Sequence, residues 1–181
     1  MILHKKTFNL KNYTIVNFDW SFFPEVLNIF KKFQKIAKIS PLLSKKLDLD
    51  SPIYEEYLAE ELKTLINKHE KTLLTIDLER NRVFAVYIFS TNVLTDNSAE
   101  LQIGFKDPDY NGWISNEVGL QSHKDIIKRC RKDLGKKDIY SVLMHRDKYD
   151  SYIKYMSKCF GVKLIKVDQL GRHIVEYPNY E

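Results

Sequence analysis

The feature that most constrains the fold is the order of strand and helix patterns along the last part of the chain, from about Ala99 to Tyr177. Apolar residues recur there at the spacing of strand, helix, strand, helix, strand and strand, with a polar turn after the first strand. A strand, a helix and a second strand in this order are typical of a crossover connection, and two closing strands with a short turn are typical of a hairpin. The pattern predicts a mixed sheet with helices on both faces.

Applied to the whole chain, the same periodicities predict the element order β-α-α-β-β-β-α-β-α-β-β. Strands are expected at residues 13–18, 73–78, 82–90, 99–106, 139–144, 162–167 and 173–177. Helices are expected at about 22–38, 51–69, 116–134 and 149–160. Ser115 is expected to cap the third helix, and Gly135 is expected to end it.

Size and composition favour one soluble globular domain over residues 1–181, with 44% hydrophobic and 29% charged residues. No apolar run reaches the roughly 18 residues needed to span a bilayer. The N-terminus has no apolar stretch followed by a small-residue cleavage site, so secretion is not expected. We expect a cytoplasmic or other intracellular location, or a virion. Cys130 and Cys159 are expected on core-facing helix positions and do not form a zinc motif, so no metal is predicted.

The chain is basic, with a formal net charge of +5 and a pI of about 9.0. Six lysines lie between residues 31 and 46: Lys31, Lys32, Lys35, Lys38, Lys45 and Lys46. One interpretation is a surface for an anionic partner such as nucleic acid or an acidic protein. The other is the solvated face of a helix, which we favour.

Three segments and their order resemble the GNAT-type N-acetyltransferases. Ala99–Phe105 followed by Asp107–Gly112 resembles the fourth strand and turn of that family, and Tyr155–Val162 resembles the helix end before its sixth strand. The order of elements is similar to the family over nearly the whole chain. The resemblance implies a central mixed, mostly antiparallel sheet with helices on both faces. It also implies acetyl transfer from acetyl-CoA to an amine of a protein or small molecule.

The family binds its coenzyme where the fourth and fifth strands splay apart, with the pyrophosphate at the N-terminus of the following helix. The resemblance assigns cofactor binding to Ile103, Phe105, Lys106, Gly112, Trp113, Ile114, Ser115 and Asn116. The family has small residues in this turn because backbone must approach phosphate closely. Here Ile114 and Asn116 stand at those two positions, and Glu117 adds a negative charge. Two interpretations stay open: an altered acetyl-CoA site, or an ordinary strand-to-helix connection that binds nothing.

Many members of the family use a carboxylate on the fourth strand as base and a tyrosine on the helix after the fifth strand as acid. The resemblance therefore makes Glu100 the candidate base, and a solvated strand-end charge is the alternative. Tyr152 and Tyr155 are the candidate acids. Tyr152 fits the apolar stripe of its helix, which favours core packing, whereas Tyr155 falls off the stripe and can face a cleft. His123 is expected on the surface of its helix, and His173 on a strand.

Two functions of different kinds follow from these patterns. The first is an acetyltransferase. The second is a catalytically inactive GNAT-fold protein that acts as a structural or interaction subunit of a larger assembly, a role that fits a phage or mobile element. Aromatic residues would anchor its partner if exposed, and would belong to the core if not. They are Trp20, Phe22, Phe23, Tyr110, Trp113 and Tyr180. A nucleic-acid-binding role ranks third, and no membrane partner is expected.

Overall fold

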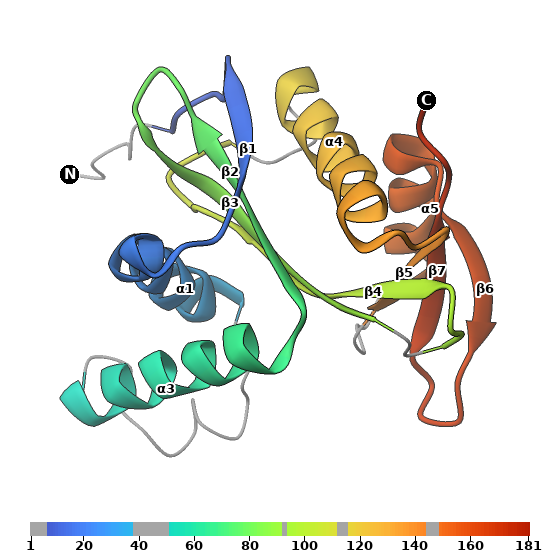
Figure 1. Cartoon of the computed structure of the whole chain (residues 1–181), viewed down its shortest axis with the longest axis horizontal. Coiled ribbons are helices and arrows are strands. Elements are labelled where there is room, and N and C mark those ends of the chain that lie inside the picture. The colour runs from blue at the N-terminus through green and yellow to red at the C-terminus, as the bar shows by residue number, and fades with distance from the viewer. Residues whose placement is uncertain (1–6, 38–50, 92–93, 112–115, 144–148) are drawn as a thin grey trace.

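The computed structural model describes residues 7–37, 51–91, 94–111, 116–143 and 149–181 (Figure 1). In this part of the chain seven strands form one sheet in the order β1-β2-β3-β4-β5-β7-β6. Neighbouring strands are antiparallel except β4 and β5, which are parallel. The predicted mixed, mostly antiparallel sheet is therefore confirmed.

The element order expected from the sequence is also confirmed, and each bound lies within two residues of its prediction. The strands are β1 (Tyr13–Asn17), β2 (Lys71–Asp77), β3 (Arg82–Thr91), β4 (Ser98–Lys106), β5 (Asp138–Leu143), β6 (Lys163–Val167) and β7 (His173–Tyr177). The helices are α1 (Phe23–Ala37), α3 (Pro52–Lys68), α4 (Glu117–Leu134) and α5 (Tyr149–Phe160), with a short 3-10 turn, Trp20–Phe22, before α1.

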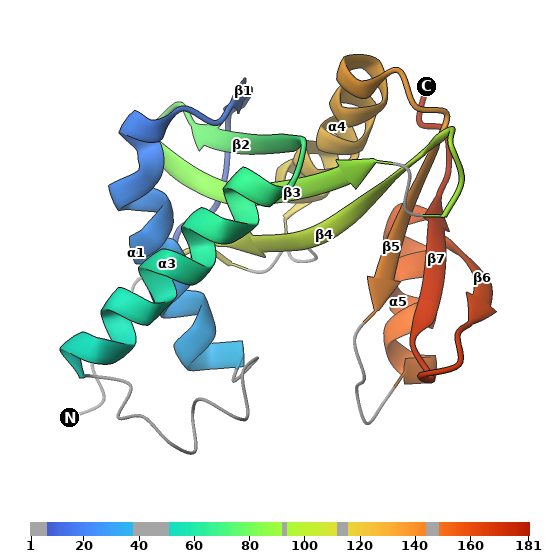
Figure 2. The same cartoon turned by 60° about the horizontal axis from the view of Figure 1, so that its bottom comes forward.

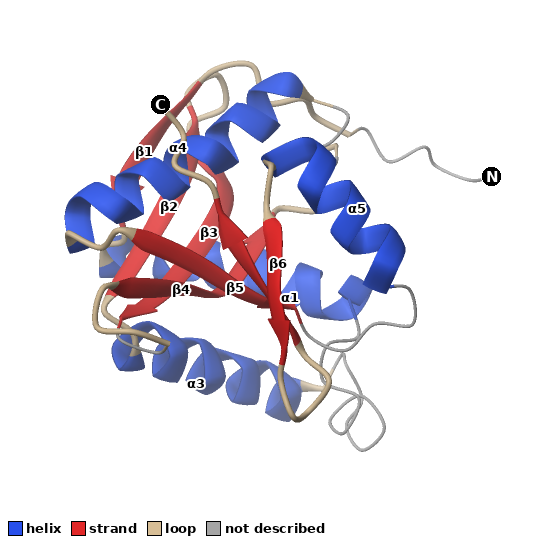
Figure 3. Cartoon of the chain, turned by 90° about the vertical axis from the view of Figure 1, so that its right-hand side faces the viewer, coloured by secondary structure: helices blue, strands red, loops and turns tan. Residues whose placement is uncertain are grey.

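Helices cover both faces of the sheet. In Figure 3 the strands form one layer, with α3 on one side and α4 and α5 on the other. The first core lies between the sheet and α1 and α3, whose buried residues follow helical spacing. These are Val26, Ile29, Phe30, Tyr54, Leu58, Leu62 and Ile66. The second core lies beneath α4 and α5 and includes Ile126, Ile127, Cys130, Met156 and Phe160.

The two cysteines and the lysines of residues 31–46 differ in their surroundings. Cys130 is buried as predicted, and Cys159 is half-buried against the same core. Lys31 pairs with Glu55 across 3.3 Å between α1 and α3, and Lys32 turns toward the sheet. Lys38, Lys45 and Lys46 lie outside the described residues.

None of the described helices combines the length and hydropathy of a membrane-spanning segment.

Gly135 ends α4 in the left-handed conformation, with φ +61° and open space around the position of a Cβ. We expect Gly135→Ala to lower the free energy of unfolding by about 1 kcal/mol, because an L side chain is strained at this φ. Gly135→Asn is the matched control and should lose less, since asparagine tolerates this conformation. Urea denaturation measures both. Equal stability of the alanine variant and the wild type would contradict the prediction.

Candidate functional site

The sheet opens between its two parallel strands. β4 and β5 pair only along Ser98–Leu101 and Asp138–Ser141. Beyond that point Gln102–Lys106 has no partner on the described part of β5, and β5 continues along β7 instead. The register of β4 against β3 also shifts at this point, between Leu101 and Ile103, which marks a β-bulge. Figure 2 shows β4 and β5 diverging into the two arms of a V.

Glu100 lies at the vertex of this V. Its neighbours Ala99 and Leu101 belong to the core beneath α4, so Glu100 lies on the opposite face of β4. The residue is only 7% exposed, and its Oε2 atom has no hydrogen-bond partner among the described residues. The alternative of a solvated strand-end charge is therefore wrong.

Burial raises the pKa of Glu100 above its ordinary value. The charge of Arg172 and a hydrogen bond from Gln102 act in the other direction but do not cancel this effect. Glu100 lies opposite Ser90 on β3 and Tyr140 on β5. A desolvated carboxylate with an uncommitted oxygen is suited to accept a proton from a substrate.

α4 begins just beyond the opening. Its N-cap is Asn116, whose Oδ1 accepts a hydrogen bond of 3.0 Å from the Val118 N–H. The cap expected at Ser115 is thus one residue too early, because the asparagine side chain serves this role. Residues 112–115 lie outside the described part of the chain, and with them the predicted cofactor residues Gly112, Trp113, Ile114 and Ser115. Glu117 is an exposed acidic residue in the first turn of the helix.

Solved structures of several acetyltransferases share this architecture. The structure is similar to an acetyltransferase from Thermus thermophilus, with TM-score 0.62 and 13% identity, covering 94% of this chain and 99% of that chain. A GNAT-family acetyltransferase from Staphylococcus aureus gives TM-score 0.57 and 18% identity, covering 92% and 98%. The PaiA N-acetyltransferase from Thermoplasma acidophilum, in complex with coenzyme A, gives TM-score 0.55 and 15% identity, covering 92% and 99%.

The chain has the GNAT fold. No family model and no curated protein sequence matches the chain. The opening between β4 and β5 lies where the resemblance places the coenzyme.

The described residues fit the coenzyme of the GNAT fold in part. The open edge of Gln102–Lys106 presents main-chain amide groups, which can pair with an amide-bearing arm as a neighbouring strand would. The N-terminus of α4 carries the positive end of the helix dipole, which favours an anion. Glu117 opposes an anion at the same place.

The predicted cofactor residues of β4 have side chains committed elsewhere. Phe105 is buried against Phe30 and Phe33, with ring centroids 5.3 and 5.5 Å away, and Ile103 packs in the same core. Lys106 donates a hydrogen bond of 2.7 Å to the carbonyl oxygen of Tyr110. Burial lowers the pKa of Lys106, although nearby aspartates partly offset this. These residues would therefore offer main-chain rather than side-chain contacts.

Of the two predicted catalytic tyrosines, Tyr155 is half-buried and packs against the core beneath α4. The same core contains Ala99 and Leu101, the neighbours of Glu100 on β4. The side chain of Tyr152 lies outside the part of the chain that the structure describes. A catalytic role for either tyrosine stays a prediction.

The turn after β4 is held by charges from two other elements. Asp107 is fully buried, hydrogen-bonded by Arg82 of β3 and 3.6 Å from Lys32 of α1. Lys32 also binds Asp109 at 2.9 Å. Tyr110 is only 2% exposed, with its ring against Phe84, so the core interpretation of this residue is confirmed. Asp107, Asp109 and Tyr110 thus each have a structural role in this turn.

The other candidate anchors differ in exposure. Trp20 is 49% exposed, while Phe22, Phe23 and Tyr180 are half-buried and pack on the two cores. Trp113 lies outside the described residues.

In the described part of the chain, no group of three His, Cys, Asp or Glu side chains is placed to hold a metal ion.

The predicted surface position of His123 is wrong. His123 lies in α4, is 3% exposed, and points into the core. Its Nδ1 lies 3.2 Å from the hydroxyl of Tyr87 on β3, and its Nε2 lies 3.1 Å from the hydroxyl of Tyr177 on β7. Because β3 and β7 lie in the two arms of the V, His123 connects the arms across the vertex. Burial lowers the pKa of His123 to about 3, so the imidazole is neutral in the folded protein.

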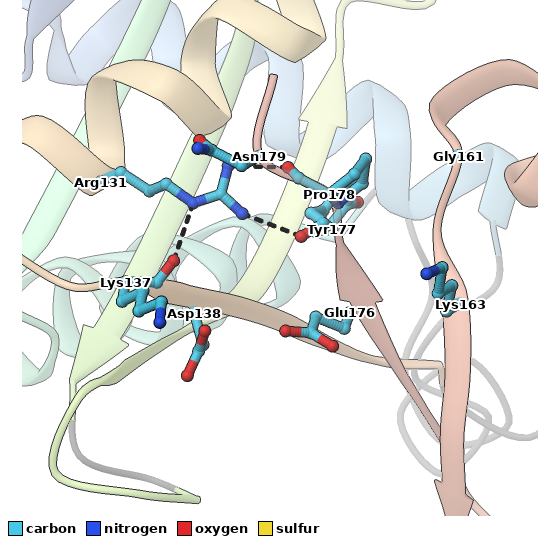
Figure 4. A pocket seen from close by; sticks show the side chains of 9 residues that line it. All are labelled: Arg131, Lys137, Asp138, Gly161, Lys163, Glu176, Tyr177, Pro178 and Asn179. Carbon is cyan, nitrogen blue, oxygen red and sulfur yellow. Dashed lines mark hydrogen bonds between the residues drawn. The ribbon is translucent and has the colours of Figure 1, made fainter. Parts of the chain in front are cut away.

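A separate pocket of about 480 Å³ lies at the other end of β5 (Figure 4). It is lined by Arg131, Lys137, Asp138, Gly161, Lys163, Glu176, Tyr177, Pro178 and Asn179. Arg131 donates to the carbonyl oxygens of Lys137, Tyr177 and Pro178 at 3.0, 2.8 and 2.8 Å. The guanidinium thus attaches the C-terminal segment to the turn after α4. Because Asp138 begins β5, this pocket is remote from the splayed ends of the strands.

Proposed function

We propose that the protein is an N-acetyltransferase that transfers the acetyl group of acetyl-CoA to an amine, with Glu100 as the general base. The observation that carries the proposal is the position of Glu100: buried, with a raised pKa and an unpartnered oxygen, at the point where β4 and β5 separate. The coenzyme complex of a protein with the same fold supports acetyl-CoA as the donor.

In this proposal the coenzyme supplies an activated thioester carbonyl. Glu100 would take a proton from the acceptor nitrogen as the new C–N bond forms and the C–S bond breaks. It would pass this proton to solvent, and the leaving thiolate would take up a proton from solvent. The unpaired edge of Gln102–Lys106 binds the arm of the coenzyme through main-chain groups. The N-terminus of α4 would bind the diphosphate through the positive end of its helix dipole.

The non-catalytic interaction subunit is kept as the second candidate because Glu117 opposes a diphosphate at the start of α4. An exposed edge strand is also consistent with it. All five residues of β6 are exposed, and Leu164, Ile165 and Val167 are 45%, 49% and 50% exposed.

Calorimetric titration separates the two candidates. We expect coenzyme A to bind the wild-type chain, and Glu117→Gln to tighten that binding about two- to five-fold, because it removes a like charge near the diphosphate. Pantetheine, which has no diphosphate, should bind both proteins equally and serves as the control ligand. Absence of coenzyme A binding at millimolar concentration would end the enzyme proposal in favour of the interaction subunit.

A further inference from the structure

The segment before β1 lies along the start of the proposed coenzyme site. We call residues Phe8–Asn12 the N-terminal strap; in Figure 1 they precede β1 at the blue end of the chain. The strap is held at its last residue and at its centre. The Asn12 carbonyl oxygen accepts a hydrogen bond of 3.1 Å from the Leu78 N–H, and the Leu10 side chain is 1% exposed in the core beneath α4.

The strap binds the residue that ends the turn after β4. The Asn111 N–H donates to the Phe8 carbonyl oxygen at 2.8 Å, and Asn111 Nδ2 donates to Asn9 Oδ1 at 2.6 Å. The Phe8 N–H donates in turn to the Asp109 carbonyl oxygen at 2.8 Å, which makes a parallel bridge between Phe8 and Tyr110. The Phe8 ring packs edge-on against Tyr110 and lies 4.6 Å beneath the guanidinium of Arg80.

The strap also binds the residue that begins α4. Asn116 Nδ2 donates to the Leu10 carbonyl oxygen at 2.8 Å, while its Oδ1 caps the Val118 N–H. The two ends of one amide group therefore join the strap to the first turn of the helix. Because serine and aspartate can cap a helix but cannot donate this second bond in the same geometry, asparagine is the residue type that does both.

Asn111 and Asn116 bracket the connection between β4 and α4, and neighbouring residues of the strap hold both. We propose that the N-terminal strap positions the start of α4 for the diphosphate of the coenzyme, with Asn116 and Asn9 as positioning residues. The inference rests on the proposed function. Its physical basis is preorganisation: a helix start that is already fixed loses less conformational freedom when an anion binds.

The test uses two variants of the 181-residue chain and a matched control. Asn116→Ser keeps a helix cap and removes the bond to Leu10, and Asn9→Ala removes the bond from Asn111 without touching α4. Asn12→Ala is the control, because its exposed side chain has no hydrogen-bond partner among the described residues. We expect Asn116→Ser and Asn9→Ala each to raise the Kd for coenzyme A about five-fold, since each loses one hydrogen bond. The Kd for pantetheine should stay unchanged in both variants, and Asn12→Ala should match the wild type in its Kd for either ligand.

Hydrogen exchange of the free protein supplies a readout that needs no ligand. Asn116→Ser should speed exchange at the amides of Phe8 and Asn111 as well as at the first turn of α4, and Asn9→Ala should speed exchange at Asn111. If the wild type binds no coenzyme A, the proposed function fails while these rates still decide whether the strap positions the helix. Unchanged exchange in both variants would overturn the inference, and so would wild-type affinity for coenzyme A in both.

Discussion

Replacing Glu100 with glutamine is expected to lower kcat/KM for amine acetylation by about 100- to 10,000-fold, the range typical of losing a positioned general base. Glutamine has nearly the same shape but cannot accept the proton of the amine. The Kd for coenzyme A should change little, because Glu100 lies in the paired part of β4, before the open edge begins. Initial rates with acetyl-CoA and a panel of amines measure the effect.

The pH dependence of the same reaction tests the environment of Glu100. The base must be ionised, so kcat/KM of the wild type should fall as the pH falls through the pKa of Glu100. Because burial raises that pKa, the fall should begin at a higher pH than for an exposed glutamate, whose pKa is about 4.3. The Glu100→Gln variant should lack this dependence.

Two controls separate catalysis from folding. The thermal midpoint of Glu100→Gln should equal or exceed that of the wild type, because glutamine removes a desolvated charge. Glu176→Gln removes a half-buried carboxylate from β7, opposite Tyr140, and should keep wild-type activity. If Glu100→Gln were as active as the wild type while binding coenzyme A normally, Glu100 would not be the base.

The sequence predicted the elements well because their signals are local. Alternation defined the strands, helical spacing defined the apolar stripes, and Gly135 closed α4 as expected. The position of Glu100 also followed from the strand pattern. Its burial did not, because the exposure of a strand residue depends on the helices and strands that pack around it.

His123 shows where local patterns stop being informative. It lies three, four and seven residues before Ile126, Ile127 and Cys130, so it belongs to the same buried stripe of α4. Helical spacing could therefore have placed it in the core. The hydroxyls that it contacts belong to Tyr87 and Tyr177, which lie 36 and 54 residues away along the chain. No local pattern connects residues so far apart. The N-terminal strap was missed for the same reason, since its bonds span about a hundred residues.

Replacing His123 is expected to cause a large loss in the free energy of unfolding. His123→Ala should lower the free energy of unfolding by about 4 kcal/mol, because it leaves a cavity of ring size and removes the ring nitrogens that contact two buried tyrosine hydroxyls. Only one ring nitrogen of neutral imidazole carries a proton, so one tyrosine receives a hydrogen bond and the other donates one. Urea denaturation at neutral pH measures the loss. His123→Gln is the matched variant: its amide also donates and accepts, so its loss should be smaller.

The same residue should make the stability of the wild type fall in mild acid. The pKa of His123 is about 3 in the folded protein and about 6.5 in the unfolded chain, so between these values only the unfolded chain takes up the proton. The contribution of neutral His123 to the free energy of unfolding is therefore fully present above pH 6.5. It falls by up to roughly 1.4 kcal/mol per pH unit as the pH decreases toward 3. Glutamine does not titrate. Between pH 6 and 4, the free energy of unfolding of His123→Gln should therefore fall less steeply with decreasing pH than that of the wild type. The difference in slope corresponds to one proton, up to roughly 1.4 kcal/mol per pH unit. Equal slopes for the wild type and His123→Gln would show that His123 is protonated in the folded protein. The inference that a neutral imidazole connects the two arms of the sheet would then be wrong.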